Sequence, residues 1–238
     1  MNLTFLRTLE GLRFPAMDSL MQAVTELGSE IVFLVVALVL FWCISKREGY
    51  YLLTVGFFGT VLNQFLKLLC RVPRPWVQDP SFTIVESARA GATGYSFPSG
   101  HTQNSVGTFG VLSRCSQRTW FRILCGVGMI LVPFSRMYLG VHTPKDVLTS
   151  FFLSIGCTLV CYVLFYRKEA AAGREALISL LMAVMSAALV LYAAVLYQNS
   201  TIELHYAQDC IKASGAGMAF ALGYYVEQKY IRFSPPAK

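Results

Sequence analysis

Apolar residues fall in long blocks that alternate with short polar segments along most of the 238-residue chain. Each block is roughly 17–22 residues long, close to the ~20 residues that a helix needs to cross a bilayer. The pattern therefore predicts an all-α, polytopic bundle of membrane helices. The predicted spans cover residues 29–45, 51–70, 99–114, 121–138, 146–166, 176–197 and 208–228.

Residues 1–25 follow a different pattern, in which apolar and polar positions alternate at helical spacing with Pro15 as a break. This pattern is typical of one or two amphipathic helices lying in the membrane interface. Charged residues interrupt its apolar stretch, so the segment does not resemble a signal peptide.

Short features between and within the spans predict how the helices end and pack. Lys46–Glu48 is expected to form a tight turn, and two prolines soon after residue 70 are expected to stop the helix before them. Gly215, Ala219 and Gly223 are spaced four residues apart. This spacing of small residues lets another helix approach closely.

The composition supports a membrane protein. Hydrophobic residues make up 55% of the chain and charged residues 14%, against about 45–50% and about 25% in soluble domains. We therefore expect one integral membrane domain over residues 1–238, with a core at 29–197 and an additional C-terminal span at 208–228.

Charge and cysteine content exclude some functions. The net charge is +7, but no long basic run is present, so nucleic acid is a poor candidate partner. An anionic substrate or membrane surface fits better. The seven cysteines include no CxxC pair, which argues against a zinc site or a redox motif.

Three polar clusters, at residues 67–75, 98–101 and 135–146, interrupt this apolar chain. Between His101 and Ser135 lie 33 residues, which as helix would extend about 50 Å. A hairpin of two legs of about 25 Å would use this length. The chain then returns to the membrane face that it left, and the clusters share one face.

The shared face carries the groups that hold a phosphate. Lys67, Arg74 and Arg136 are cations, and arginine favours bidentate contacts with phosphate oxygens. A helix beginning at Ser99 would point free backbone N–H groups at the same place.

The same clusters contain two of the three histidines, His101 and His142. One histidine can attack phosphorus while the other protonates the leaving oxygen. Asp146 lies one helical turn after His142, where a carboxylate can fix the tautomer of the imidazole.

Each residue also has a purely structural interpretation. Lys67 can extend to the membrane interface, Ser99 can cap a helix, and residues 143–146 form a capping box with proline in its first turn. The combination favours function, because charge beside lipid is costly. A transporter or scaffold with an anion site remains an alternative.

The order K-x6-RP, PSGH and SR-x5-H-x3-D, spanning residues 67–146, resembles the three-part signature of the type 2 phosphatidic acid phosphatase superfamily. Its soluble relatives are vanadium haloperoxidases and bacterial acid phosphatases; the membrane spans oppose a haloperoxidase here. The resemblance implies a six-helix core, so the span at 208–228 is additional.

The resemblance also implies residue roles. His142 would form a phosphohistidine, Asp146 would orient it, and His101 would act as general acid and then as base. No metal or other cofactor would be needed, because cations neutralise the developing charge. The residues implied to hold the phosphoryl oxygens are Lys67, Arg74, Ser99, Gly100 and Arg136.

The implied activity is metal-independent hydrolysis of a lipid phosphate or a lipid diphosphate taken from the membrane. The sequence does not choose between phosphatidic acid, phosphatidylglycerophosphate, a polyprenyl diphosphate and a sphingoid phosphate. It gives no prediction of oligomeric state.

The distribution of lysine and arginine predicts the orientation in the cell membrane. With the N-terminus outside, 11 of these cations lie on the cytoplasmic side, including Arg167, Lys168 and Lys238, and nine lie outside. Three of the nine are catalytic candidates. The remaining bias places the active site outside, by the positive-inside rule.

Overall fold

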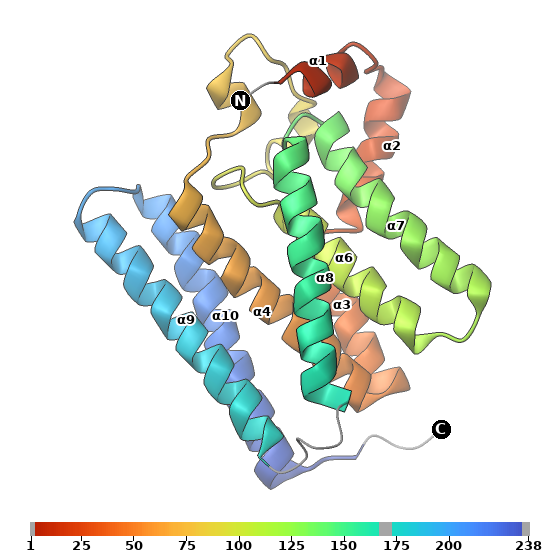
Figure 1. Cartoon of the computed structure of the whole chain (residues 1–238), viewed down its shortest axis with the longest axis vertical. Helices are drawn as coiled ribbons and strands as arrows, with labels where there is room; N and C mark the ends of the chain where they lie inside the picture. The colour runs from red at the N-terminus through yellow and green to blue at the C-terminus, as the bar shows by residue number, and fades with distance from the viewer. Residues whose placement is uncertain (1–2, 167–172, 235–238) are drawn as a thin grey trace.

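The protein is described by a computed structural model covering residues 3–166 and 173–234, and these residues form helices and loops without a strand. Long helices run side by side as a bundle, and short helices and a long loop cover one end (Figure 1). The helices are α1 Thr4–Glu10, α2 Pro15–Glu26, α3 Glu30–Val39, α4 Lys46–Cys70, α5 Pro75–Gln78, α6 Gly100–Cys115, α7 Thr119–Tyr138, α8 Pro144–Tyr166, α9 Arg174–Gln198 and α10 Leu204–Val226. This architecture confirms the predicted all-α bundle.

Helix α4 lies at the centre of the bundle and contacts α3, α6, α8, α9 and α10. Ser45 caps its first turn by accepting a hydrogen bond from the Glu48 backbone N–H. Tyr51, Leu52 and Val55 on α4 are buried in the apolar core. The long helix therefore acts as the scaffold for residues at its C-terminal end.

Helices α6 and α7 form a packed hairpin, and α8 packs against α6. The end of α7 and the start of α8 are joined only by residues 139–143. The predicted spans at 99–114, 121–138 and 146–166 thus agree closely with α6, α7 and α8.

The outward surfaces of the long helices are apolar, as in a multi-pass membrane protein. Ile130, Phe152, Leu191 and Leu222 are each at least two-thirds exposed. Four helical segments of the described chain are long and apolar enough to cross a membrane: Lys46–Gln78, α7, α8 and α9. The bent pair Pro15–Glu26 and Glu30–Ile44 would make a fifth.

Seven spans were expected from the sequence, and four helical segments meet the criteria of length and hydropathy on their own. The other three predicted spans correspond to α3, α6 and α10. Helix α6 has only 16 residues, and its Thr102, Gln103, Asn104 and Ser105 are buried. Helix α10 is long enough but carries charges near its start. Helix α3 is extended by a π-helical turn, Leu40–Ile44, and bends by 46° from α2.

The N-terminal segment forms the two helices expected around Pro15, which occupies the first turn of α2. Helices α1 and α2 pack against α7. Their position in the membrane interface stays a prediction, and α2 forms a bent pair with α3.

One prediction about a helix end is wrong and another is confirmed. Lys46–Glu48 forms the first turn of α4, and the reversal before it is made by Leu40–Ile44 and Ser45. Helix α4 ends at Cys70, before the prolines as predicted, and Arg71 caps it in a left-handed conformation with φ 45°.

The predicted small-residue contact on α10 uses the wrong face. Gly215, Ala219 and Gly223 are exposed, and a Cβ added at either glycine would meet nothing within 4 Å. The packed face instead contains Gly217, where an added Cβ would lie 2.4 Å from Ser186 Oγ of α9. Gly217 is the position that permits close packing of α9 and α10.

Candidate active site

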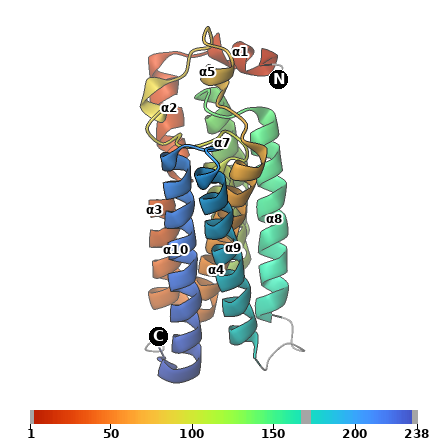
Figure 2. The same cartoon turned by 90° about the vertical axis from the view of Figure 1, so that its left-hand side faces the viewer.

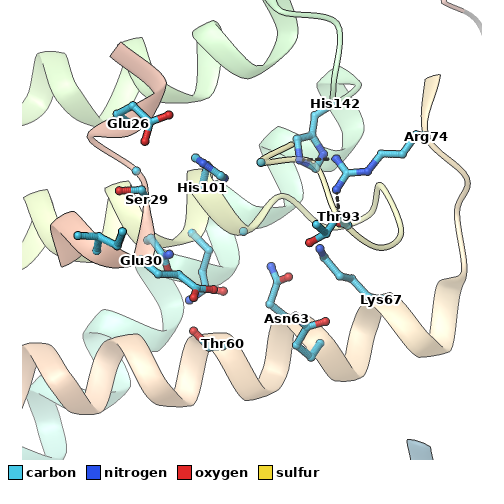
Figure 3. Close-up of a pocket in the computed structure, with 17 residues that line it drawn as sticks. Glu26, Ser29, Glu30, Thr60, Asn63, Lys67, Arg74, Thr93, His101 and His142 are labelled. Atoms are coloured by element: carbon cyan, nitrogen blue, oxygen red, sulfur yellow. Dashed lines mark hydrogen bonds between the residues drawn. The ribbon is translucent and has the colours of Figure 1, made fainter. Parts of the chain in front are cut away.

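A cavity of about 380 Å³ contains both predicted catalytic histidines (Figure 3). Its wall is built from the α2–α3 junction, α4, the loop at Gly91–Thr93, α6 and His142. In Figure 3, Lys67, Arg74 and His142 lie together on one side, with Glu26, Ser29 and Glu30 across the cavity.

Helix α4 supplies the face that lines the cavity. Thr60, Asn63, Gln64 and Lys67 are spaced at three or four residues, so they project to one side of the helix. Lys67 Nζ lies 3.8 Å from the position that a Cβ on Gly94 would occupy. Its ammonium group is therefore held beside the loop that leads to α6.

The start of α6 places Gly100 and His101 at the cavity. Ser99 is fully buried, and its Oγ accepts hydrogen bonds from Thr102 Oγ1 at 3.0 Å and the Thr102 N–H at 3.4 Å. Ser99 therefore caps α6, as its structural interpretation predicted. It does not line the cavity, whereas the next two residues do.

Arg74 is fixed by carbonyl oxygens before any ligand arrives. It donates to Thr93 O at 2.6 Å, Val141 O at 2.9 Å and Gly94 O at 3.0 Å. Its Nη1 also lies 3.0 Å from His142 Nε2. The guanidinium group and the imidazole are therefore in direct contact at the cavity wall.

His142 follows α7 in the short connection to α8 and is almost fully buried. Burial, followed by the charge of Arg74, lowers the pKa of His142 well below its usual range, although Asp146 opposes this shift. The imidazole is therefore neutral near pH 7. A neutral ring nitrogen retains the lone pair that nucleophilic attack requires.

Asp146 caps a helix, as its structural interpretation predicted, and it also lies near His142. Its Oδ2 accepts from Ser96 Oγ at 2.6 Å and the Thr143 N–H at 2.8 Å, while Thr143 Oγ1 lies 3.4 Å from the Asp146 N–H. The same Oδ2 lies 3.6 Å from His142 Nδ1. The carboxylate therefore caps α8 and faces the imidazole.

The contact between Asp146 and His142 is longer than a hydrogen bond. Within residues 3–166 and 173–234, buried His142 Nδ1 and Asp146 Oδ1 have no hydrogen-bond partner. Catalytic hydrogen bonds often tighten only when substrate binds. A small movement of either side chain would bring Asp146 Oδ2 and His142 Nδ1 within hydrogen-bond distance.

Arg136 is not brought to the cavity with Lys67 and Arg74. Its buried guanidinium donates to Thr25 Oγ1 at 3.0 Å and to Gly91 O at 3.5 Å. It therefore ties α2 and the loop at Gly91, both next to the cavity wall, to the end of α7. Its implied contact with phosphate stays a prediction.

The sequence analysis missed the uncharged amides and the acids of the cavity. Asn63 lies four residues before Lys67, and Asn104 lies three after His101, so helical spacing from the signature would have found both. Glu26 and Glu30 had no such signal, because the junction between α2 and α3 carries no signature residue.

Comparison with known proteins identifies the fold family. The family profile described as the PAP2 superfamily matches residues 47–170, more than half of the chain. The chain belongs to the PAP2 superfamily. The match extends from α4 to just beyond α8 and includes every residue of the three-part signature.

Individual PAP2 relatives are also similar. Undecaprenyl-diphosphatase BcrC of Bacillus subtilis is 30% identical over 65% of this chain and 79% of its own length. Phosphatidylglycerophosphatase B of Bacillus subtilis is 29% identical over 60% of this chain and 73% of its own length.

A solved PAP2 structure supports the same fold. The crystal structure of a transmembrane PAP2-type phosphatidylglycerolphosphate phosphatase from Bacillus subtilis aligns with a TM-score of 0.55 and 25% identity. The alignment covers 66% of this chain and 81% of that one.

Proposed function

We propose that this PAP2 protein is a lipid phosphatase that hydrolyses a lipid phosphate or a lipid diphosphate through a phosphohistidine. The observation that carries the proposal is the single cavity lined by His101, His142, Lys67 and Arg74. The names of its relatives support a phosphorylated lipid as the substrate.

In the first step His142 Nε2 attacks phosphorus, and the bond from phosphorus to the leaving oxygen breaks. A phosphoryl group arriving between Arg74 and His142 would replace their 3.0 Å contact. Arg74 would then donate hydrogen bonds to the phosphoryl oxygens. Lys67 and the N-terminus of α6 would stabilise the same charge. The negative charge of the bound phosphoryl group would favour the protonated form of His101, which would then give its proton to the leaving oxygen.

In the second step water attacks the phosphohistidine, and the bond between phosphorus and Nε2 breaks. His101 takes the proton of the water, so phosphate leaves and His142 is restored. Asp146 would stabilise His142 while it carries positive charge, because the carboxylate faces Nδ1. Arg136 is proposed to hold the cavity wall in place.

Phosphate release by the purified protein in detergent tests the proposal. The panel should contain phosphatidic acid, phosphatidylglycerophosphate, a polyprenyl diphosphate and a sphingoid phosphate, with His142→Ala as the control. We expect release from at least one lipid by the wild type and none by the variant. Equal release from both proteins, or none by the wild type, would contradict the proposal.

The same assay tests the proposed metal independence. Activity is expected to survive a strong chelator, because protein cations supply the charge stabilisation. Vanadate is expected to inhibit as a mimic of pentacoordinate phosphorus. Loss of activity with chelator and recovery with magnesium would indicate a different mechanism.

A further inference from the structure

A second cavity, of about 460 Å³, adjoins the active-site cavity between α3 and α10. We call it the α3–α10 groove. The two cavities have five lining residues in common: Glu30, Thr60, Gln64, Thr93 and Asn104. A ligand bound at His142 therefore has a continuous path into the groove.

Two helices that pack on different neighbours form the walls. Helix α3 packs against α4 and α6, while α10 packs against α4 and α9. In Figure 2 α3 is drawn next to α10, whereas in Figure 1 the two helices lie on opposite sides of α4, so the groove between them runs along α4. Phe33 and Leu34 line the groove from α3, Ala213 and Ala216 line it from α10, and Phe57 of α4 lies between them. The small alanines leave room beside these larger side chains.

Along the path the lining becomes more apolar, although Glu30, Asp209 and Lys212 also line the groove. Lys67, Arg74 and His142 lie at the catalytic end, the amides Asn63 and Gln64 follow, and the aromatic and aliphatic residues of the groove come last. A lipid phosphate has the same order of charged head, polar linker and hydrocarbon tail. Burial of the tail against apolar side chains is favourable.

The groove opens on the apolar surface of the bundle. Leu34 is 40% exposed, and Ala216 is also exposed. In a membrane these residues face lipid, so a tail could enter sideways. At the rim, Asp209 Oδ1 lies 3.6 Å from the Nζ of the largely exposed Lys212. Charged side chains extend to the headgroup level of a membrane, so the apolar part of the groove next to this rim would lie below that level.

We propose that the α3–α10 groove holds the hydrocarbon tail of the substrate while its phosphate lies at His142. The proposal rests on the proposed function. Helices α3 and α10 lie outside the PAP2 match at 47–170. The tail preference of this protein would therefore depend partly on segments outside the family match, and α10 acquires a role in substrate selection.

Filling the groove tests this role. Ala216→Phe places an aromatic ring in the groove from an exposed position of α10, so we expect the variant to fold. Ala219→Phe is the matched control, because Ala219 is exposed on the same helix and does not line the groove. Two lipid phosphates with the preferred headgroup serve as substrates, one with a tail of about 18 carbons and one with a tail of about 6 carbons.

For Ala216→Phe we expect kcat/KM on the long-tailed substrate to fall by about tenfold or more, since several CH₂ groups lose their burial. The value for the short-tailed substrate should change less than about twofold, and Ala219→Phe should match the wild type on both. An equal loss on both substrates, or an unchanged value on the long one, would overturn the proposal.

Photolabelling gives a measurement that is independent of turnover. A lipid phosphate with a diazirine in the middle of its tail, bound to inactive His142→Ala, should label peptides from α3 and α10. Labelling confined to α7 or α8 would overturn the groove assignment. If the wild type hydrolyses no lipid, the proposed function fails, while the labelling still decides whether the groove holds a tail.

Discussion

At Asp146, one carboxylate oxygen serves both the fold and the proposed chemistry. It accepts hydrogen bonds from Ser96 and Thr143 and lies 3.6 Å from His142. The sequence supported both roles. The structure makes them compatible, because Asp146 lies in the first turn of α8 and His142 lies just before that helix. Catalytic and structural effects of changing Asp146 must therefore be separated.

Asp146→Asn provides this separation. Asparagine keeps an oxygen that can accept the capping hydrogen bond but removes the negative charge beside His142. We expect thermal stability to change by about 1 kcal/mol or less and kcat to fall by ~10²–10⁴-fold. Thermal unfolding and phosphate release measure the two effects. Near-wild-type turnover by a folded variant would remove Asp146 from the mechanism.

The two histidines should fail in different ways. His142→Ala removes the proposed nucleophile, so turnover of alkyl and aryl phosphates should be lost equally. His101→Ala removes the proton donor, which is worth ~10²–10⁴-fold when the leaving oxygen is basic. A nitrophenolate needs little protonation, so this variant should retain far more activity on p-nitrophenyl phosphate than on an alkyl phosphate.

Phosphate labelling of both variants completes this comparison. His101→Ala is expected to accumulate labelled protein, since water activation is also impaired, and His142→Ala should remain unlabelled. Equal leaving-group dependence in the two folded variants, or labelling of His142→Ala, would show that the roles are assigned wrongly.

At the level of single helices, hydropathy predicted most boundaries and the signature predicted the cavity-lining histidines. The sequence analysis failed where tertiary packing determines which face of a helix is buried. The face of α10 that contacts α9 is centred on Gly217, and glycine spacing alone favoured the exposed face with Gly215 and Gly223. Both faces contain small residues, so only the position of α9 distinguishes them.

Arg136 is a second case in which tertiary contacts could not be foreseen. The sequence grouped it with Lys67 and Arg74 because all three are cations of the signature. The structure turns its guanidinium toward Thr25 on α2. That partner lies more than a hundred residues earlier in a segment without signature residues.

Alanine at Gly217 and at Gly215 should have opposite effects on stability. At Gly217 the added Cβ would lie 2.4 Å from buried Ser186 Oγ, so Gly217→Ala should destabilise by ~1–3 kcal/mol. At Gly215 it meets nothing, so Gly215→Ala should stabilise by ~0.5–1 kcal/mol through helix propensity. Thermal unfolding in one detergent compares them, and equal shifts would contradict this packing of α9 and α10.

On the scale of the whole molecule, charge is concentrated at both ends of the bundle. The cavity end holds Lys67 and Arg74. The other end has its own network, in which Arg114 donates to Glu48 and Tyr166, and Arg47 donates to Phe165 O at 2.5 Å. This second end also contains the turn between α6 and α7, with Arg118. Arg167, Lys168 and Lys238, which were counted in the same prediction, lie outside the described residues.

We propose that the cavity faces the outside of the cell membrane and the turn between α6 and α7 faces the cytoplasm. Cations that do not line the cavity are then in excess on the inner side, as the positive-inside rule requires. Gln117→Cys marks the turn and Ala90→Cys marks the loop at the cavity end, and both positions are exposed. The exposed native Cys43 and Cys70 should be replaced by serine to remove their background labelling.

In intact cells, a membrane-impermeant maleimide should label Ala90→Cys and spare Gln117→Cys until the membrane is opened. The orientation has a functional consequence, because the groove and the cavity would then take lipid from the outer leaflet. Labelling of Gln117→Cys in intact cells would reverse the orientation while leaving the proposed chemistry unchanged. Phosphate release into the external medium by cells supplied with an outer-leaflet lipid phosphate should agree with the labelling, because hydrolysis occurs on the side that the cavity faces.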